Sequence, residues 1–124
     1  MIWRWSLALL MLAHGGIHLL GFLGPAGLSD MDGIPREATF LLDAFEVGSP
    51  VLIAFGALWL VAAIGFFAAA IGWITRSAWW RPLAAASAVI STALIVLWWT
   101  DAMVGMIPNL IVFAILIWSQ RHTV

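Results

Sequence analysis

The stretch VLIAFGALWLVAAIGFFAAAIGWI, residues Val51–Ile74, decides the fold class. It contains no charged residue, and its glycines and alanines alternate with large apolar side chains. A transmembrane α-helix needs about 20 consecutive, mostly apolar residues, and only a helix or a closed barrel satisfies its backbone hydrogen bonds in lipid. We therefore predict that this segment crosses a bilayer as a helix.

Three further segments have the same character. The predicted membrane-spanning helices cover residues 2–23, 51–74, 79–99 and 103–118. They use most of the 124 residues, which leaves room for one domain and none for a separate soluble domain. The predicted fold is therefore all-α, an integral membrane four-helix bundle that forms a single domain over residues 1–124.

The composition agrees with a protein solvated by lipid. Hydrophobic residues make up 65% of the chain and charged residues only 9%, whereas a soluble domain carries about 25% charged residues. The formal net charge of −1 gives no electrostatic reason to expect a nucleic-acid partner. Because the chain has no cysteine, disulfides, thiolate metal ligands and cysteine nucleophiles are excluded.

One long polar stretch, residues 28–50, separates the first two spans and holds most of the acidic residues. Within it, residues 35–47 carry apolar side chains at helical spacing, which predicts a short amphipathic helix at the membrane surface. Ser49 and Pro50 then predict an N-cap and a first helical residue for the second span.

The arginines predict the orientation of the bundle. With four spans, the N-terminus, the turn at residues 75–81 and the C-terminus share one side. That side holds Arg4, Arg76, Arg81 and Arg121. The other side holds Arg36 alone. Because positively charged loops stay in the cytoplasm, we expect both termini to be cytoplasmic and the acidic 28–50 loop to lie outside.

Small residues predict how the second and third spans pack. Helices in lipid gain little from apolar contact with each other, so close approach of small side chains matters. The stripes consist of Gly65, Ala68, Ala69 and Gly72 in the second span, and of Ala84, Ser87, Ala88 and Ser91 in the third. We expect these stripes to hold the two spans together as a hairpin.

His14 and His18 are the first candidates for a functional site. Their i, i+4 spacing places both imidazoles on one face of the first span, together with Met11 and Gly21. Two such imidazoles could bind a metal ion, contact a proton or substrate, or hydrogen-bond across the bundle. Their His-Gly-Gly-Ile-His motif lacks the glutamate of the catalytic His-Glu-x-x-His zinc motif.

Carboxylates on the predicted outer side could complete such a site. Asp43 and Glu46 lie at i, i+3 spacing before the second span, and Asp101 follows the third. With His18 beside them and His14 at the floor, they could form an outward-facing pocket for a metal ion, a proton relay or a cation. Alternatively, Asp43 and Glu46 are solvated loop charges and Asp101 is the N-cap of the fourth helix.

The remaining candidates are a set of thioethers and one amide. Met103 and Met106, with Met11, could suit Cu(I), although methionine in an apolar helix more often only packs. Asn109 is an amide within a span, where such a group usually ties helices together by a hydrogen bond. A bis-histidine haem is not expected, because the two histidines of the spans share one helix.

Two segments carry a resemblance to a known group of proteins. They are AHGGIHLLGF, residues 13–22, and WTDAMVGMIPN, residues 99–109. Both are similar to segments of small four-helix bacterial membrane proteins without an assigned activity, loosely DoxX-like in size and layout. The resemblance implies four spans in a bacterial inner membrane, and likeness to the quinone-linked members would imply a role beside a redox partner. It draws attention to His14, His18, Asp101 and Asn109.

Three classes of function remain open. The first is a binding or channel-like protein whose outward pocket, formed by His14, His18, Glu46 and Asp101, holds a metal ion, a proton or a small ligand. The second is an accessory subunit that packs into a homodimer or a larger membrane complex. The third is a membrane metal or quinone-linked redox enzyme that uses the same residues. Histidines pointing into the bundle beside Asp101 would favour a site, and histidines pointing to lipid would favour a subunit.

Overall fold

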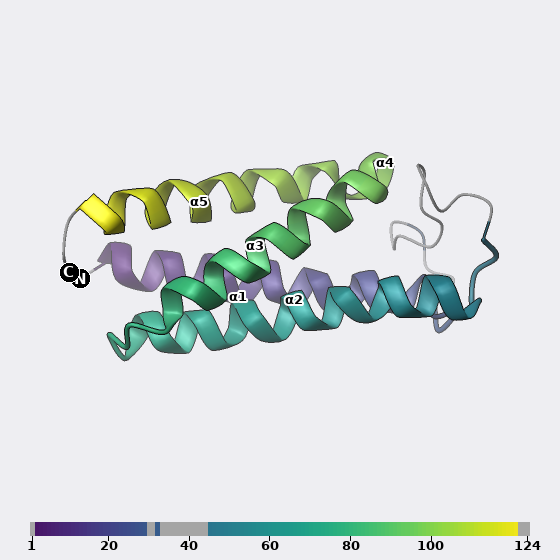
Figure 1. The fold of residues 1–124 in the computed structure, drawn as a ribbon, viewed down its shortest axis with the longest axis horizontal. Coiled ribbons are helices and arrows are strands. Elements are labelled where there is room, and N and C mark those ends of the chain that lie inside the picture. Colours follow the sequence, from purple (N-terminus) through teal and green to yellow (C-terminus); the bar gives the residue numbers. More distant parts are fainter. Residues whose placement is uncertain (1, 30–31, 33–44, 122–124) are drawn as a thin grey trace.

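The computed structural model describes residues 2–29, 32 and 45–121. All regular secondary structure in this part of the chain is helical: α1 (Ile2–Leu23), α2 (Pro50–Ile74), α3 (Trp80–Leu97), α4 (Trp99–Ala102), the 3-10 helix η1 (Met103–Gly105) and α5 (Met106–Arg121). The long helices lie lengthwise beside one another, and α1 begins and α5 ends near the turn between α2 and α3 (Figure 1). The all-α prediction is therefore confirmed.

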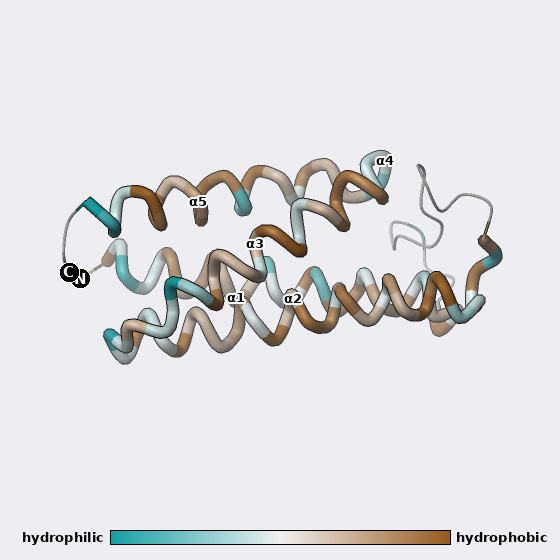
Figure 2. Tube along the Cα trace, in the orientation of Figure 1, coloured by the Kyte–Doolittle hydropathy of each residue, from teal (hydrophilic) through white to brown (hydrophobic). Residues whose placement is uncertain are grey.

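Four segments are long and apolar enough to cross a membrane: Ile2–Leu23, Pro50–Ile74, Trp80–Leu97 and Trp99–Arg121. Hydrophobic residues predominate along all four (Figure 2). The fourth segment begins earlier and ends later than predicted, and the third ends earlier. Trp98, whose φ of −108° and ψ of 37° interrupt the helix and separate α3 from α4, explains the early end of the third segment and the early start of the fourth.

The surface helix predicted over residues 35–47 lies mostly outside the described residues. Of that range the structure describes residues 45–47, which form a bend and a turn and no helix. The next element begins as predicted, because Ser49 is the N-cap of α2 and Pro50 is its first residue. The Ser49 hydroxyl accepts a hydrogen bond from the Leu52 N–H at 3.4 Å.

The tight turn predicted after the second span is confirmed, and it places Arg76 in the left-handed region at φ 58°. The Ser77 N–H donates to the Gly72 carbonyl at 2.9 Å, and the Arg76 N–H donates to the Trp73 carbonyl at 3.3 Å. These two bonds form a Schellman motif, in which glycine usually occupies the left-handed position. An arginine in that position projects a positive charge from the end of α2.

The predicted hairpin of small residues is also confirmed. Ala69 of α2 and Ala84 and Ala88 of α3 are completely buried. A Cβ atom added to Gly65 would overlap the Ser87 hydroxyl, so the absence of a side chain at Gly65 is what lets α3 approach α2.

Two apolar clusters fill the bundle, one at each end. Near the α2–α3 turn, Leu7, Phe66 and Trp80 belong to one cluster. Toward α4, Trp59 and Trp98 belong to the other. α1 packs along α2, α2 along α3, and α3 against α5, whereas α1 and α5 have few contacts with each other. The bundle is therefore open along the α1–α5 seam.

Candidate functional site

Five polar side chains from three helices meet between the two apolar clusters. α1 contributes His14 and His18, α3 contributes Ser91 and Thr92, and α5 contributes Asn109. Ser91 and Asn109 are completely buried, and the two histidines are 3% and 1% exposed. A buried polar group is costly unless it is hydrogen-bonded, so each polar atom of these side chains is expected to have a partner. We call this set the polar network.

The hydrogen-bond partners of His18 determine which of its ring nitrogens donates and which accepts. Its Nδ1 lies 2.7 Å from the His14 carbonyl oxygen, which can only accept, so Nδ1 carries the hydrogen. In a neutral imidazole Nε2 is then the acceptor. Nε2 lies 2.7 Å from the Ser91 hydroxyl, which therefore donates to it.

The hydroxyl groups of Ser91 and Thr92 determine the orientation of the Asn109 amide. Its Nδ2 donates to the Ser91 hydroxyl at 2.8 Å and to the Thr92 hydroxyl at 3.1 Å. The Thr92 hydroxyl itself donates to the Ala88 carbonyl at 2.7 Å. A reversed amide would place its oxygen against two hydroxyls whose hydrogens are already used. The Asn109 oxygen therefore faces His14.

One ring nitrogen of His14 has no hydrogen-bond partner among the described residues. Its Nε2 lies 2.8 Å from Asn109 Oδ1 and must donate to it. In the neutral ring Nδ1 then carries only a lone pair. Nδ1 is buried and has no hydrogen-bond partner in the part of the chain that the structure describes. The polar network thus satisfies its other ring and amide atoms and leaves a single acceptor open.

A cavity of about 330 Å³ lies beside the polar network. It lies between α1 and the α4–η1–α5 segment, and both histidines line it. Trp59 of α2 lines the same cavity. The Trp59 indole N–H is buried and likewise has no partner among the described residues. Two of the side chains that line the cavity therefore each hold a buried ring nitrogen without a partner among the described residues, one an acceptor and one a donor, while most of the remaining lining is apolar.

A glycine and several aromatic rings position Trp59. Its indole lies against the His18 ring with a centroid distance of 5.0 Å and against Trp98 at 5.8 Å. A Cβ atom on Gly21 would lie 2.5 Å from the Trp59 ring, so the ring reaches α1 only because Gly21 has no side chain. Phe66 supports the other imidazole, with its ring centroid 4.9 Å from that of His14.

The structure brings together some of the candidates from the sequence and separates others. Asp101 lines the same cavity as the two histidines, and Asn109 bonds to His14. Asp101 is exposed and lies inside α4, so it is not the N-cap of the fourth span. Glu46 is exposed and does not line the cavity. Asp43 lies outside the described residues.

The three methionines do not form a common group. Met11 is completely buried in the apolar cluster near the α2–α3 turn. Met106 packs against the opposite cluster, and Met103 is half exposed. Met11 and Met106 therefore belong to opposite ends of the bundle.

Sequence reasoning missed three contributors to the site. Ser91 was predicted to pack only, and Thr92 and Trp59 were not singled out. A tryptophan in the middle of a span was the available signal, because tryptophan in membrane proteins favours the interface. Two adjacent hydroxyl residues in the middle of the third span were a second signal.

The side chains around the cavity offer few atoms that could bind a metal ion. Three of the four imidazole nitrogens form hydrogen bonds within the bundle. Over residues 2–29, 32 and 45–121, no group of three or more His, Cys, Asp or Glu side chains could hold a metal ion.

The fold and the site define a helical bundle with a buried polar network and an adjoining, mostly apolar cavity. No protein-family model, curated protein or solved structure matches the chain. The likeness to DoxX-like proteins therefore stays a prediction from two short segments.

Proposed function

We propose that this chain is an integral membrane protein that binds a small, mostly apolar ligand in the cavity beside His14. The observation that carries the proposal is the open acceptor at His14 Nδ1, on a side chain that lines the cavity. A buried polar atom without a partner is rare in folded proteins and calls for an explanation such as a bound molecule.

The size of the cavity and the side chains that line it limit the class of ligand. A volume of about 330 Å³ is at the lower end of ligand pockets, which suits a molecule of one or two rings. Its polar group should donate to His14 Nδ1 and accept from the Trp59 indole N–H. A hydroxyl group does both. Water does so as well and is the competing occupant, although the apolar lining offers it few other partners.

The surroundings of the cavity suggest a route of entry. Its lining includes Ile17, Val104 and Ile107, which are 60%, 69% and 61% exposed. In a bilayer such apolar surface contacts lipid, so a ligand dissolved in the hydrocarbon can reach the cavity sideways. We propose the orientation predicted from the arginines, in which this end of the bundle is the outer one.

The placement of the histidines favours a binding site over a subunit surface. Both imidazoles point into the bundle, where an interface with a partner protein could not reach them. Because one ring nitrogen remains free, the donor set suits an organic molecule better than a metal ion, which needs several ligands.

Binding of a hydroxylated probe tests this function. We expect 1-naphthol to bind the detergent-purified protein about fivefold more tightly than 1-methylnaphthalene, which has a similar shape and no hydroxyl, because one good hydrogen bond is worth about 1 kcal/mol. In His14→Gln, the glutamine amide can still donate to Asn109 while the Nδ1 acceptor is lost. That variant should keep its thermal stability and lose the preference for 1-naphthol. Equal affinity of the wild-type protein for both probes would contradict the proposal.

Two tryptophans supply a matched pair of variants for the same measurement. The indole N–H groups of Trp59 and Trp98 are both buried and without partners among the described residues, but Trp98 does not line the cavity. We expect Trp59→Phe to weaken 1-naphthol binding several-fold and Trp98→Phe to leave it unchanged. If both variants weakened binding equally, the effect would come from packing of the aromatic cluster and not from the ligand.

A further inference from the structure

Three arginines surround one pocket at the opposite end of the bundle. The pocket has a volume of about 590 Å³ and is lined by Arg4, Arg76 and Arg81 with indole rings between them. No acidic side chain is among the residues that line it. The three charges come from α1, the α2–α3 turn and the first turn of α3, so the fold itself gathers them.

Two of the three arginines are held in place by hydrogen bonds, and no described residue neutralises any of them. Arg4 donates through Nη2 to the Ile74 carbonyl, and Arg81 donates through Nη2 to the Ser119 carbonyl at 3.3 Å. Carbonyl groups carry no net charge, so neither bond compensates an arginine. The Arg81 Nε atom is buried and unpartnered, and the Arg76 guanidinium has no hydrogen bond or ion pair with the described residues. An anion in the pocket would meet three guanidinium groups with donors to spare.

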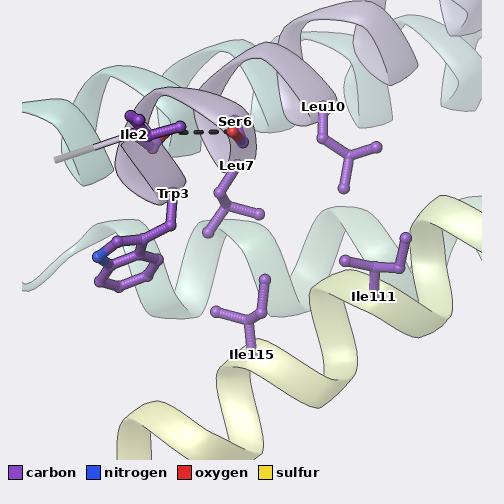
Figure 3. Close-up of a pocket in the computed structure, with 7 residues that line it drawn as sticks. All are labelled: Ile2, Trp3, Ser6, Leu7, Leu10, Ile111 and Ile115. Atoms are coloured by element: carbon purple, nitrogen blue, oxygen red, sulfur yellow. Dashed lines mark hydrogen bonds between the residues drawn. The ribbon is translucent and has the colours of Figure 1, made fainter.

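An apolar groove adjoins this pocket along the open α1–α5 seam. Leu7 and Leu10 of α1 face Ile111 and Ile115 of α5 across it (Figure 3). Its volume is about 1000 Å³. The one hydroxyl in its lining, on Ser6, donates to the Ile2 carbonyl of its own helix at 3.2 Å, and most of the lining is apolar.

Trp3 joins the groove to the pocket, because its ring lines both. The ring packs edge to face on Trp73, with a centroid distance of 4.9 Å. The Trp73 indole N–H donates to the Arg4 carbonyl at 2.8 Å, which fixes the start of α1 against the end of α2. The basic pocket and the apolar groove therefore lie next to each other with the Trp3 ring between them, and the groove runs about 10 Å along α1 from Trp3 to Leu10.

We propose that an anionic phospholipid occupies this site, with its phosphate among Arg4, Arg76 and Arg81 and an acyl chain in the α1–α5 groove. Guanidinium groups bind phosphate through paired hydrogen bonds, and basic pockets between membrane helices hold anionic headgroups. A free phosphate would leave the groove empty. A helix of a second copy would fill the groove without supplying an anion to the pocket. A phospholipid satisfies both parts with one molecule.

Lipid retention by native mass spectrometry tests the proposal. The detergent-purified protein is mixed with phosphatidylglycerol and phosphatidylcholine of the same acyl chains. We expect one retained phosphatidylglycerol per chain and a clear preference over phosphatidylcholine. Arg76→Gln should reduce that preference about fivefold, since each basic residue near an anionic lipid contributes about that factor. This variant leaves the hydrogen bonds of Arg4 and Arg81 intact.

Arg121→Gln is the matched control, because Arg121 is exposed in the last turn of α5 at the same end and does not line the pocket. It should retain phosphatidylglycerol as the wild-type protein does. The preference of the wild-type protein should also weaken as salt is raised, which needs no variant. Leu10→Trp, which fills part of the groove, should lower retention of the full lipid.

Three results would overturn the proposal. Equal retention of the two lipids would show that the arginines do not select an anion. Retention of inorganic phosphate as strong as that of phosphatidylglycerol would identify a free-anion site. A lipid-free dimer, lost in Leu10→Trp, would make the groove a contact between two copies of the chain.

Discussion

Replacing Asn109 with leucine is expected to lower the free energy of unfolding by about 2 to 3 kcal/mol. The amide makes three hydrogen bonds, to His14, Ser91 and Thr92. Leucine has a similar size, so the change creates little empty space. It leaves the His14 Nε2–H with only the more distant Ser91 hydroxyl, at 3.5 Å, as an acceptor, and a poorly satisfied buried group costs about 1 to 3 kcal/mol. Hydrogen bonds between membrane helices contribute about 0.6 kcal/mol on average, so three of them bring a similar amount.

Unfolding of the detergent-purified protein by a denaturing surfactant measures this effect. Thr92→Val is the control, because it removes only one bond to Asn109 at the edge of the polar network. It should cost under about 1 kcal/mol. If Asn109→Leu destabilised the protein no more than Thr92→Val, the amide would not be the link between α1, α3 and α5.

Replacing Gly21 with alanine should destabilise the protein by about 2 kcal/mol, because an inserted methyl group overpacks the contact between α1 and α2. The new Cβ atom would lie 2.5 to 2.9 Å from three atoms of the Trp59 ring. Trp59 cannot turn aside freely, since His18 and Trp98 flank its ring. The ring must shift, and the wall of the cavity shifts with it because Trp59 lines the cavity. We therefore expect Gly21→Ala to lose 1-naphthol binding as well as stability.

Gly16→Ala on the same helix provides the comparison. A Cβ atom there would meet nothing within 4 Å, so the higher helix propensity of alanine should leave stability unchanged or raise it by up to about 1 kcal/mol. The same denaturation series serves both variants. A loss of stability in Gly16→Ala as large as in Gly21→Ala would mean that the effect arises in the helix backbone and not at Trp59.

Local properties of the sequence determined the elements of this fold. Apolar runs of sufficient length predicted four helices that can cross a membrane, and Ser49-Pro50 predicted where α2 begins. The i, i+4 spacing placed His14 and His18 on one face, and the small residues of α2 and α3 predicted their close packing. These features depend on neighbours within one or two helical turns, or on the side-chain size along a single stripe, so a single sequence carries them.

Only the tertiary structure decided which residues the two histidines contact. His14 and Asn109 are 95 positions apart, and His18 and Ser91 are 73 apart. No periodicity in one helix specifies which residue of another helix lies opposite, because that depends on how four helices cross. The break at Trp98 moved Asp101 into a short helix, and the absence of a side chain at Gly21 brought Trp59 to α1. The open acceptor on His14 follows from the complete set of hydrogen bonds, which exists only once α1, α3 and α5 have packed together.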